Sequence, residues 1–372
     1  MKMFSAPVTA IAITMLLGGG AAADDNAVDD LVAYQQTNLT SNLPGQAAVT
    51  DPNLKNPWGI AWAPGGALWA SDNNSGLSTL YNGTGSITPL VVAIPPMEAA
   101  APTGMVWNPN AGNQFIIPGT TIGATFIFNG EDGTITAWNP AADPVVTGKS
   151  TASLVIDNSA AGAVYKGLAY GTNARGNFIF ATNFNSGKVE AYDVRFTLTT
   201  LDGAFIDPNL PAGYAPFGIA NIDGDLFVTY AKQDAAKHDP VRGDGLGFVD
   251  VFSTSGRFIR RFASRGVLNA PWGVVRAPIG FGKFGGDVLI GNFGNKGRFA
   301  GWITAFGNRG ELHGELRTPQ GRPIAIDGLW ALTFGSFAAS DGDTLYFTAG
   351  PNDEEDGLFG KLTAAPAARH GG

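Results

Sequence analysis

The chain alternates between short apolar runs and polar turns from residue 56 almost to its end. Residues 56–64, 67–73 and 77–83 each hold a short apolar stretch that is followed by turn-forming residues, namely Pro, Ser-Asp-Asn and Asn-Gly in that order. Apolar runs of this length, bounded by turn residues, predict β-strands rather than helices. We therefore read this first region as three short strands joined by turns.

Variants of this unit recur, each opening with a bulky or polar residue, then Gly, then an apolar strand. The copies are Trp58-Gly59-Ile60, Thr103-Gly104-Met105, Lys166-Gly167-Leu168, Phe217-Gly218-Ile219, Trp272-Gly273-Val274 and, more loosely, Asp327-Gly328-Leu329-Trp330. Their glycines follow one another at steps of 45 to 63 residues. Steps of this size are typical of the blades of a β-propeller.

The repeat predicts an all-β fold, a six-bladed β-propeller of four-stranded antiparallel blades. One blade cannot bury both faces of its sheet, so it packs against its neighbours in a ring. The last blade ends near residue 362 one strand short, and residues 34–40 resemble a strand without a partner. We expect the N-terminal strand to close the ring, because closure removes exposed sheet edges. The expected segments are a mobile stretch at 24–33, one propeller at 34–363 and a disordered tail at 364–372.

Composition supports a β-rich, turn-rich protein. The chain has 52 Gly and 23 Pro, and only 15% of its residues are charged. It has no Cys, which excludes disulfides and thiolate metal sites. Its net charge of −8 argues against nucleic-acid binding. We expect a monomer without a membrane-spanning segment.

The first 23 residues have the pattern of a secretory signal peptide. Lys2 supplies a positive end, residues 6–17 are apolar but too short to span a membrane, and residues 21–23 are all Ala. This order of charge, apolar run and small residues is typical of a cleaved signal. We therefore expect a periplasmic or extracellular protein.

Several stretches resemble a family of secreted bacterial propellers with NHL-like repeats. They are residues 51–59, 162–167, 231–234, 327–332 and 346–350. The resemblance covers nearly all of the chain after the signal. It implies the propeller fold and export, and it carries no activity over.

The candidate site is one mouth of the central channel. In antiparallel blades, the start of the first strand and the turn after the second lie on the same face of the ring. This places two sets of side chains together. The candidate ligand-binding residues are Trp58, Lys166, Phe217, Trp272 and Asp327 before the first strands, and Glu131, Asn183 and Asn292 after the second. Lys166 is the only cation of its set, and a buried cation needs a counter-charge. We expect Glu131 or Asp327 to supply it.

Two functions fit these residues. The first is a binding or scaffolding propeller whose ligand is a peptide, a glycan or a small molecule. The second is a calcium-dependent hydrolase similar to the gluconolactonase-type propellers, with Asn183, Asn292 and Glu131 as candidate metal ligands, because Ca²⁺ prefers oxygen ligands. Those enzymes place Glu, Asn and Asp before the inner glycine, and here Asp327 alone matches. His238 lies near the same mouth, where a surface role and a role as a base both remain open.

Overall fold

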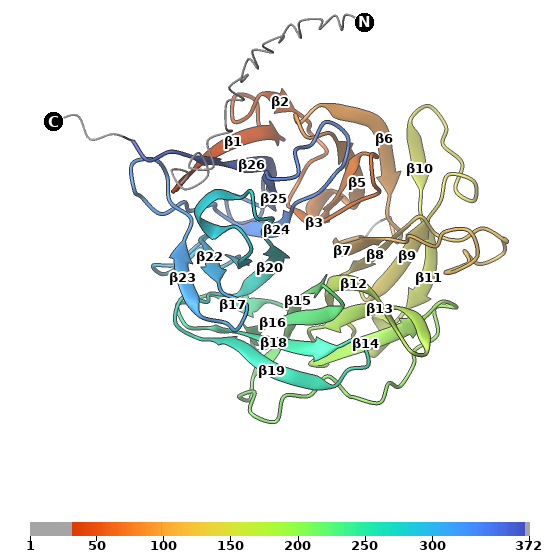
Figure 1. Ribbon diagram of the computed structural model, residues 1–372. Helices are drawn as coiled ribbons and strands as arrows, with labels where there is room; N and C mark the ends of the chain where they lie inside the picture. Colours follow the sequence, from red (N-terminus) through yellow and green to blue (C-terminus); the bar gives the residue numbers. More distant parts are fainter. Residues whose placement is uncertain (1–31, 98, 369–372) are drawn as a thin grey trace, which may run out of the picture.

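The computed structural model describes residues 32–97 and 99–368, and they form six small β-sheets around a central axis (Figure 1). The six-bladed propeller predicted from the repeat is confirmed. The expected signal peptide at 1–23, and all but two residues of the segment 24–33, lie outside the described residues. Within the described residues no helix is long and apolar enough to cross a bilayer.

The blades follow the chain in order, with their strands running from the axis outwards. The first holds β3 (Pro57–Trp62), β4 (Leu68–Asp72), β5 (Leu77–Tyr81) and β6 (Ile87–Ala93), to which β10 (Lys149–Thr151) adds in parallel. The second holds β7 (Pro102–Trp107), β8 (Phe126–Gly130), β9 (Thr134–Trp138) and β11 (Ser153–Asp157). The third holds β12 (Tyr165–Asn173), β13 (Gly176–Asn183) and β14 (Lys188–Asp193).

The second half of the ring repeats this order. The fourth blade holds β15 (Tyr214–Ile222), β16 (Asp225–Gln233), β18 (Gly247–Ser253) and β19 (Phe258–Ser264), with the short β17 (Pro240–Val241) paired to β16. The fifth holds β20 (Pro271–Arg276), β21 (Val288–Asn292), β22 (Ile303–Phe306) and β23 (Leu312–Glu315). The sixth holds β24 (Leu329–Thr333), β25 (Leu345–Ala349) and β26 (Leu358–Ala365). Three 3₁₀ turns complete the described elements: η2 (Asn73–Ser75), η3 (Ser159–Ala161) and η4 (Gly282–Phe284).

The N-terminal strand closes the ring as predicted. Strand β1 (Ala33–Ser41) pairs antiparallel with β26 and becomes the fourth strand of the sixth blade, and β2 (Val49–Thr50) adds to it in parallel. Strand β26 continues to Ala365, so it takes the first two residues of the segment that we expected to be a disordered tail.

In five of the six blades the repeated glycine lies in a bulge of the innermost strand, where two residues of that strand face one residue of the second strand. In the sixth blade this bulge falls between Leu329 and Leu332 and therefore holds Trp330-Ala331. The assignment of Asp327-Gly328 to this position was wrong by three residues. The reason is that Ala331 replaces the glycine on which the sequence pattern depends, while Gly328 serves a turn with a positive φ of 64°.

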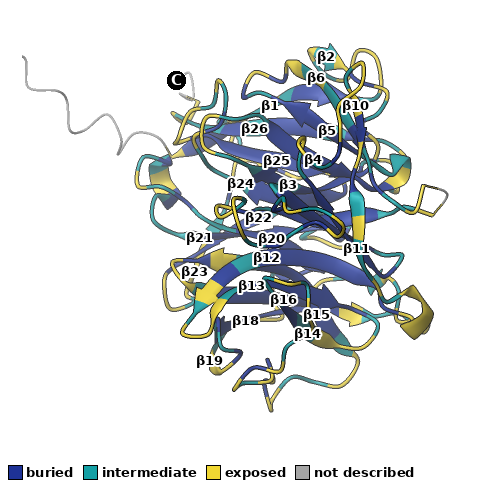
Figure 2. Ribbon diagram, turned by 90° about the vertical axis from the view of Figure 1, so that its right-hand side faces the viewer, coloured by how far each residue is buried: buried dark blue, intermediate teal, exposed yellow. Residues whose placement is uncertain are grey.

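The glycine is required where adjacent blades meet at the axis. A Cβ on Gly218 would collide with the carbonyl oxygen of Trp272 in the next blade. The ring thus brings six backbones together, and it holds at one mouth the side chains of Trp58, Thr103, Lys166, Phe217, Trp272 and Trp330. Figure 2 shows the strands around the axis as buried and the connecting loops as exposed.

Candidate functional site

Six aromatic rings fill the axis below this mouth. Trp58 stacks on Trp330 with 3.4 Å between ring centroids, and Trp330 stacks on Phe293 at 3.7 Å. The other members of this aromatic plug are Phe184, Phe217 and Trp272. The predicted residues Trp58, Phe217 and Trp272 therefore do lie at the axis. They are all buried and pack on one another, so they form a floor rather than an open stacking surface.

Lys166 lies on this floor and is fully buried. Its ammonium is 5.2 Å from the ring centroid of Trp58 and 5.7 Å from that of Phe184, which places it in cation–π range of both. It forms the expected ion pair with Glu131, and a second one of 3.5 Å with Asp239. The other expected partner, Asp327, is exposed and instead accepts a hydrogen bond from the backbone N–H of Asn352.

The two carboxylates that face Lys166 are held very differently. Glu131 is 12% exposed, and its second oxygen accepts a 2.9 Å hydrogen bond from Asn73. Asp239 is 67% exposed and lies in the connection between β16 and β18, where His238 Nδ1 is 3.0 Å from the same oxygen that faces Lys166. Burial acts to raise the pKa of Asp239, but the charges of Lys166 and His238 outweigh it, so that pKa lies below its usual value. Glu131 is thus a fixed partner of Lys166, and Asp239 is an exposed one.

A second ion pair lies at the same mouth. Arg242 donates a 2.6 Å hydrogen bond to Glu354, and its guanidinium lies over the ring of Phe293 at 4.6 Å. The other oxygen of Glu354 accepts from Asn56. Burial raises the pKa of Glu354, and the Glu131 carboxylate adds to the rise, although Arg242 and Lys166 oppose it. We call six titratable residues of this face the mouth cluster, namely Glu131, Lys166, His238, Asp239, Arg242 and Glu354.

The side-chain oxygen and nitrogen of both Asn183 and Asn292 form hydrogen bonds within the protein. The Asn183 oxygen accepts the backbone N–H of Val164 and its nitrogen donates to Glu190 at 2.8 Å. The Asn292 oxygen accepts the backbone N–H of Asn269, and its nitrogen donates to two carbonyls. In both turns the Phe that follows the Asn, Phe184 or Phe293, is the residue that reaches the aromatic plug.

One group of side chains in the described structure has the spacing of metal ligands. Glu131, His238 and Asp239 each offer one ligand atom, and these atoms lie within 4.8 Å of one another. This group shares Glu131 with the expected calcium ligands, whereas the carboxamides of Asn183 and Asn292 are held by the hydrogen bonds described above. The ammonium of Lys166 contacts two of its three members, so a cation there would meet a positive charge.

Sequence reasoning missed half of the mouth cluster. Arg242 and Asp239 lie in the insertion between β16 and β18, and the repeat pattern gives no position for an insertion. Glu354 lies in the acidic turn after β25, which the pattern places at this mouth without choosing among its carboxylates. Long-range contacts bring these residues to the mouth, such as those of Asp239 with Lys166 and of Arg242 with Phe293, and these contacts become visible only in the fold.

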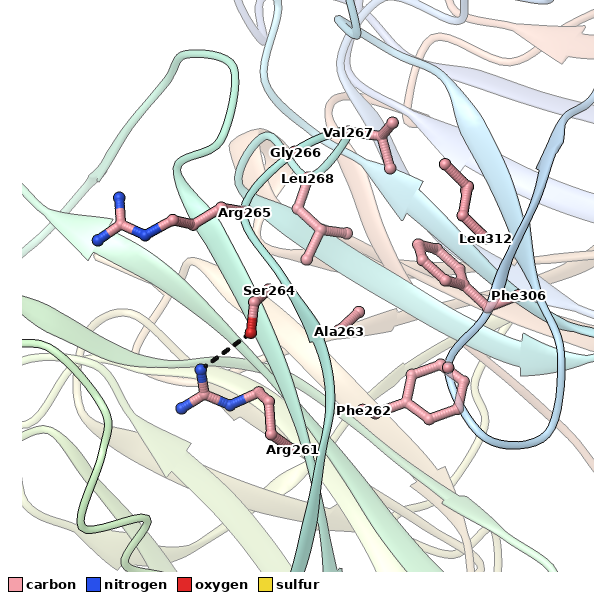
Figure 3. Close-up of a pocket in the computed structure, with 11 residues that line it drawn as sticks. Arg261, Phe262, Ala263, Ser264, Arg265, Gly266, Val267, Leu268, Phe306 and Leu312 are labelled. Atoms are coloured by element: carbon pink, nitrogen blue, oxygen red, sulfur yellow. Dashed lines mark hydrogen bonds between the residues drawn. The ribbon is translucent and has the colours of Figure 1, made fainter.

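Several hollows lie away from the mouth. At the other end of the channel, a cavity of about 120 Å³ is lined by apolar side chains that include Ile60, Met105 and Leu168. On the rim, a hollow of about 290 Å³ lies between β19 and the β22–β23 hairpin (Figure 3). Its Arg261 pairs with the buried Asp207 and Asp250 and donates to Ser264, so the charge of this guanidinium is already neutralised.

Comparisons with known proteins show sequence relatives that match most of this chain. The chain is 34% identical to the uncharacterised protein R648 of Acanthamoeba polyphaga mimivirus over 337 residues, which is 87% of this chain and 78% of that protein. It is 31% identical to the uncharacterised protein L690 of the same virus, over 89% of this chain and 86% of that protein. No protein-family model matches the chain.

Among solved structures, the PQQ-bound aldose sugar dehydrogenase of Streptomyces coelicolor has a TM-score of 0.50 at 15% identity, covering 89% of this chain and 98% of that one. At this identity the likeness concerns the fold alone, and function has to be argued from the site.

Proposed function

We propose that this chain, which belongs to the same protein family as R648 and L690 of Acanthamoeba polyphaga mimivirus, is a binding propeller that takes an anionic ligand at its polar mouth. The observation that carries the proposal is the ion triplet of Lys166. One of its two carboxylates is enclosed, and the other, Asp239, is exposed.

This arrangement suits the binding of an anion, because a ligand carboxylate or phosphate can replace the carboxylate of Asp239 beside Lys166. An ammonium with no exposure to solvent is costly to leave without a counter-charge, so Lys166 keeps Glu131. Asp239 can leave, because water solvates its carboxylate once the connection between β16 and β18 moves outwards. A ligand carboxylate or phosphate then takes its place beside Lys166. Since the aromatic plug is closed, the ligand is recognised by its charge and by the polar rim rather than by stacking.

The test compares two variants with opposite expected effects. Asp239→Ala removes the internal competitor and should bind D-galacturonate or inorganic phosphate at least tenfold more tightly than the natural chain. Lys166→Met should abolish that binding. Asp223→Ala is the matched control, since Asp223 is also an exposed acid in an ion pair, with Arg276, away from the mouth. Calorimetric titration at low salt measures all four proteins.

The results separate a binding site from a structural tie. If Lys166→Met melts far below the natural chain and neither probe binds to Asp239→Ala, the triplet only holds the blades together and the proposal is wrong. A structural role makes no prediction of tighter binding in Asp239→Ala.

A metal-dependent hydrolase is the second candidate, favoured by the spacing of Glu131, His238 and Asp239. Carboxylate and imidazole ligands together suit Zn²⁺ or Mn²⁺ better than Ca²⁺. Lys166 opposes any cation at this place, so Lys166→Met should increase metal affinity if the site exists. Metal analysis of the purified chain, with Ca²⁺ included, checks this candidate directly.

Export remains part of the proposal and is supported by the pattern of residues 1–23. Sequencing the N-terminus of the protein recovered from its producing cells tests it. We expect a mature chain that begins at Asp24.

A further inference from the structure

The third blade differs from the other five in the number of its strands. In those five blades a strand pairs antiparallel with the third one: β6, β11, β19, β23 or β1. In the third blade the sheet ends at β14, and the structure describes no further strand beyond it in residues 32–97 and 99–368. Figure 1 shows β14 as the outermost strand arrow of its blade.

The chain after β14 begins to fill this position and then turns away. The backbone N–H of Thr199 donates a 2.8 Å hydrogen bond to the carbonyl of Ala191. The following residues cross to the neighbouring blade, where Gly203 and Phe205 donate to the carbonyls of Ser255 and Gly256. The backbone N–H of Asp193 also donates to the carbonyl of Thr197, and Tyr192 forms an isolated bridge with Leu198. The outer edge of β14 is therefore already paired over its second half, from Ala191 to Asp193.

The unfilled half of the edge has a free backbone donor and acceptor. Residues two apart in a strand present their N–H and C=O groups on the same side. Ala191 accepts from Thr199 on the outer side, so Val189 also presents its N–H and C=O outwards. On the inner side of the sheet, Val189 lies opposite Thr182 in the register of β13 and β14.

A cavity of about 410 Å³ lies beside this half of the edge. Its lining includes the apolar side chains of Val189, Leu201 and Phe205. Two of the exposed large hydrophobic residues of the chain also line it, Leu198 at 61% and Ile206 at 64% exposure. A free strand edge beside an apolar hollow is the arrangement to which an extended peptide adds as a strand.

We propose that an extended segment of a partner protein docks here and completes the third blade as its fourth strand. The five other blades show what this position holds, namely a strand antiparallel to the third one. The sixth blade shows that the strand need not follow in sequence, because β1 comes from the opposite end of the chain.

The expected partner segment is extended, with apolar residues at alternate positions. One side of it faces the hollow at Leu201 and Phe205, and its backbone bonds to Val189. The exposed Lys188 at the same edge favours an acidic residue at one end of the segment. This surface lies on the outer rim and does not depend on the mouth cluster.

The probes are five labelled peptides with the sequences of the chain's own outer strands, residues 33–41, 87–93, 153–157, 258–264 and 312–315. Fluorescence anisotropy measures their binding to the full chain, and at least one is expected to bind. Val189→Pro removes the outward N–H while leaving the inner ladder intact, because proline is tolerated at an edge where the N–H faces solvent. This variant should lose binding at least tenfold with an unchanged melting temperature.

A second variant and a control keep the test independent of folding. Leu198→Asp places a charge beside the hollow and should also weaken binding at least tenfold. Ile279→Asp is the matched control, because Ile279 is 79% exposed on another blade, and it should bind as the natural chain does. Failure of all five peptides, or equal loss in the control, would overturn the proposal. Dimerisation that Val189→Pro abolishes would assign the edge to a second copy of this chain instead, which also overturns it.

Discussion

The hydroxyl of Thr348 donates a 2.6 Å hydrogen bond to the carbonyl oxygen of Trp58, across the junction where the last blade meets the first. The same bond occurs between the third and fourth blades, from Thr182 to the carbonyl of Phe217. Both hydroxyls and both carbonyls are buried. Closure of the ring therefore rests on side-chain bonds near the axis as well as on strand pairing at the rim.

The junction predicts the effect of Thr348→Val. This change keeps the shape of the side chain but leaves the buried carbonyl of Trp58 without this donor, which should lower the free energy of unfolding by about 1–3 kcal/mol. Urea unfolding measures it. Thr172→Val is the control, because Thr172 is exposed, and it should change stability by less than about 0.5 kcal/mol. Equal effects of the two substitutions would contradict a role in closure.

Removal of the closing strand should have a larger effect. Tyr34 in β1 is fully buried, and its hydroxyl donates to the carbonyl of Phe281 in the fifth blade. A chain that begins at Thr50 lacks this residue and exposes the edge of β26, so we expect it to aggregate or to melt at a much lower temperature. A chain that begins at Val32 keeps all of β1 and is the control. Equal melting temperatures for the two truncated chains would refute closure by β1.

The close approach of the blades predicts that Gly218→Ala is strongly destabilising. The added methyl group meets the carbonyl of Trp272, which is backbone and cannot move without shifting the next blade. We expect a loss of about 1–3 kcal/mol, the usual range for overpacking. Gly112→Ala is the control, since a methyl group on Gly112 would have open space around it for 4 Å. Thermal unfolding measures both variants. A melting temperature that falls only in Gly218→Ala supports a steric requirement, and an equal fall in both variants contradicts it.

Asp250 predicts a pH dependence of stability. Burial raises the pKa of this carboxyl group to about 7, and Asp207 adds to the rise while Arg261 opposes it. A carboxyl group whose pKa is higher in the folded state contributes stability that is complete below its unfolded pKa, near 4, and is lost as the pH rises through about 7. The natural chain should therefore lose stability between pH 4 and pH 7.

Asp250→Asn isolates this contribution from those of other buried carboxyl groups. The variant should lose less stability than the natural chain over the same pH range, because the amide does not titrate. Urea unfolding at pH 4, 5, 6 and 7 measures the two slopes. Parallel slopes would show that Asp250 keeps an ordinary pKa.

The repeat of apolar runs and glycines was sufficient to predict the six blades and the closing strand. Both follow from local chemistry, since short apolar runs between turns form strands and a blade needs a neighbour to bury its faces. The prediction failed at Asp327, where Ala331 stands in for the expected glycine. It also gave no sign of the missing fourth strand after β14, because the residues that follow it are as apolar as those of a strand and yet cross to the next blade.

The sequence by itself determined the architecture and the presence of one buried cation near the axis. Lys166 occupies a position that the repeat assigns to the inner strand, and burial requires a counter-charge wherever that strand lies. Only the tertiary structure decided which carboxylates meet it. Asp239 comes from an insertion outside the repeat. Asp327 lies three residues before Trp330, which holds the expected position in the sixth inner strand. Contacts across the axis join residues that are distant in sequence, and their partners depend on bulges and insertions that no local pattern records.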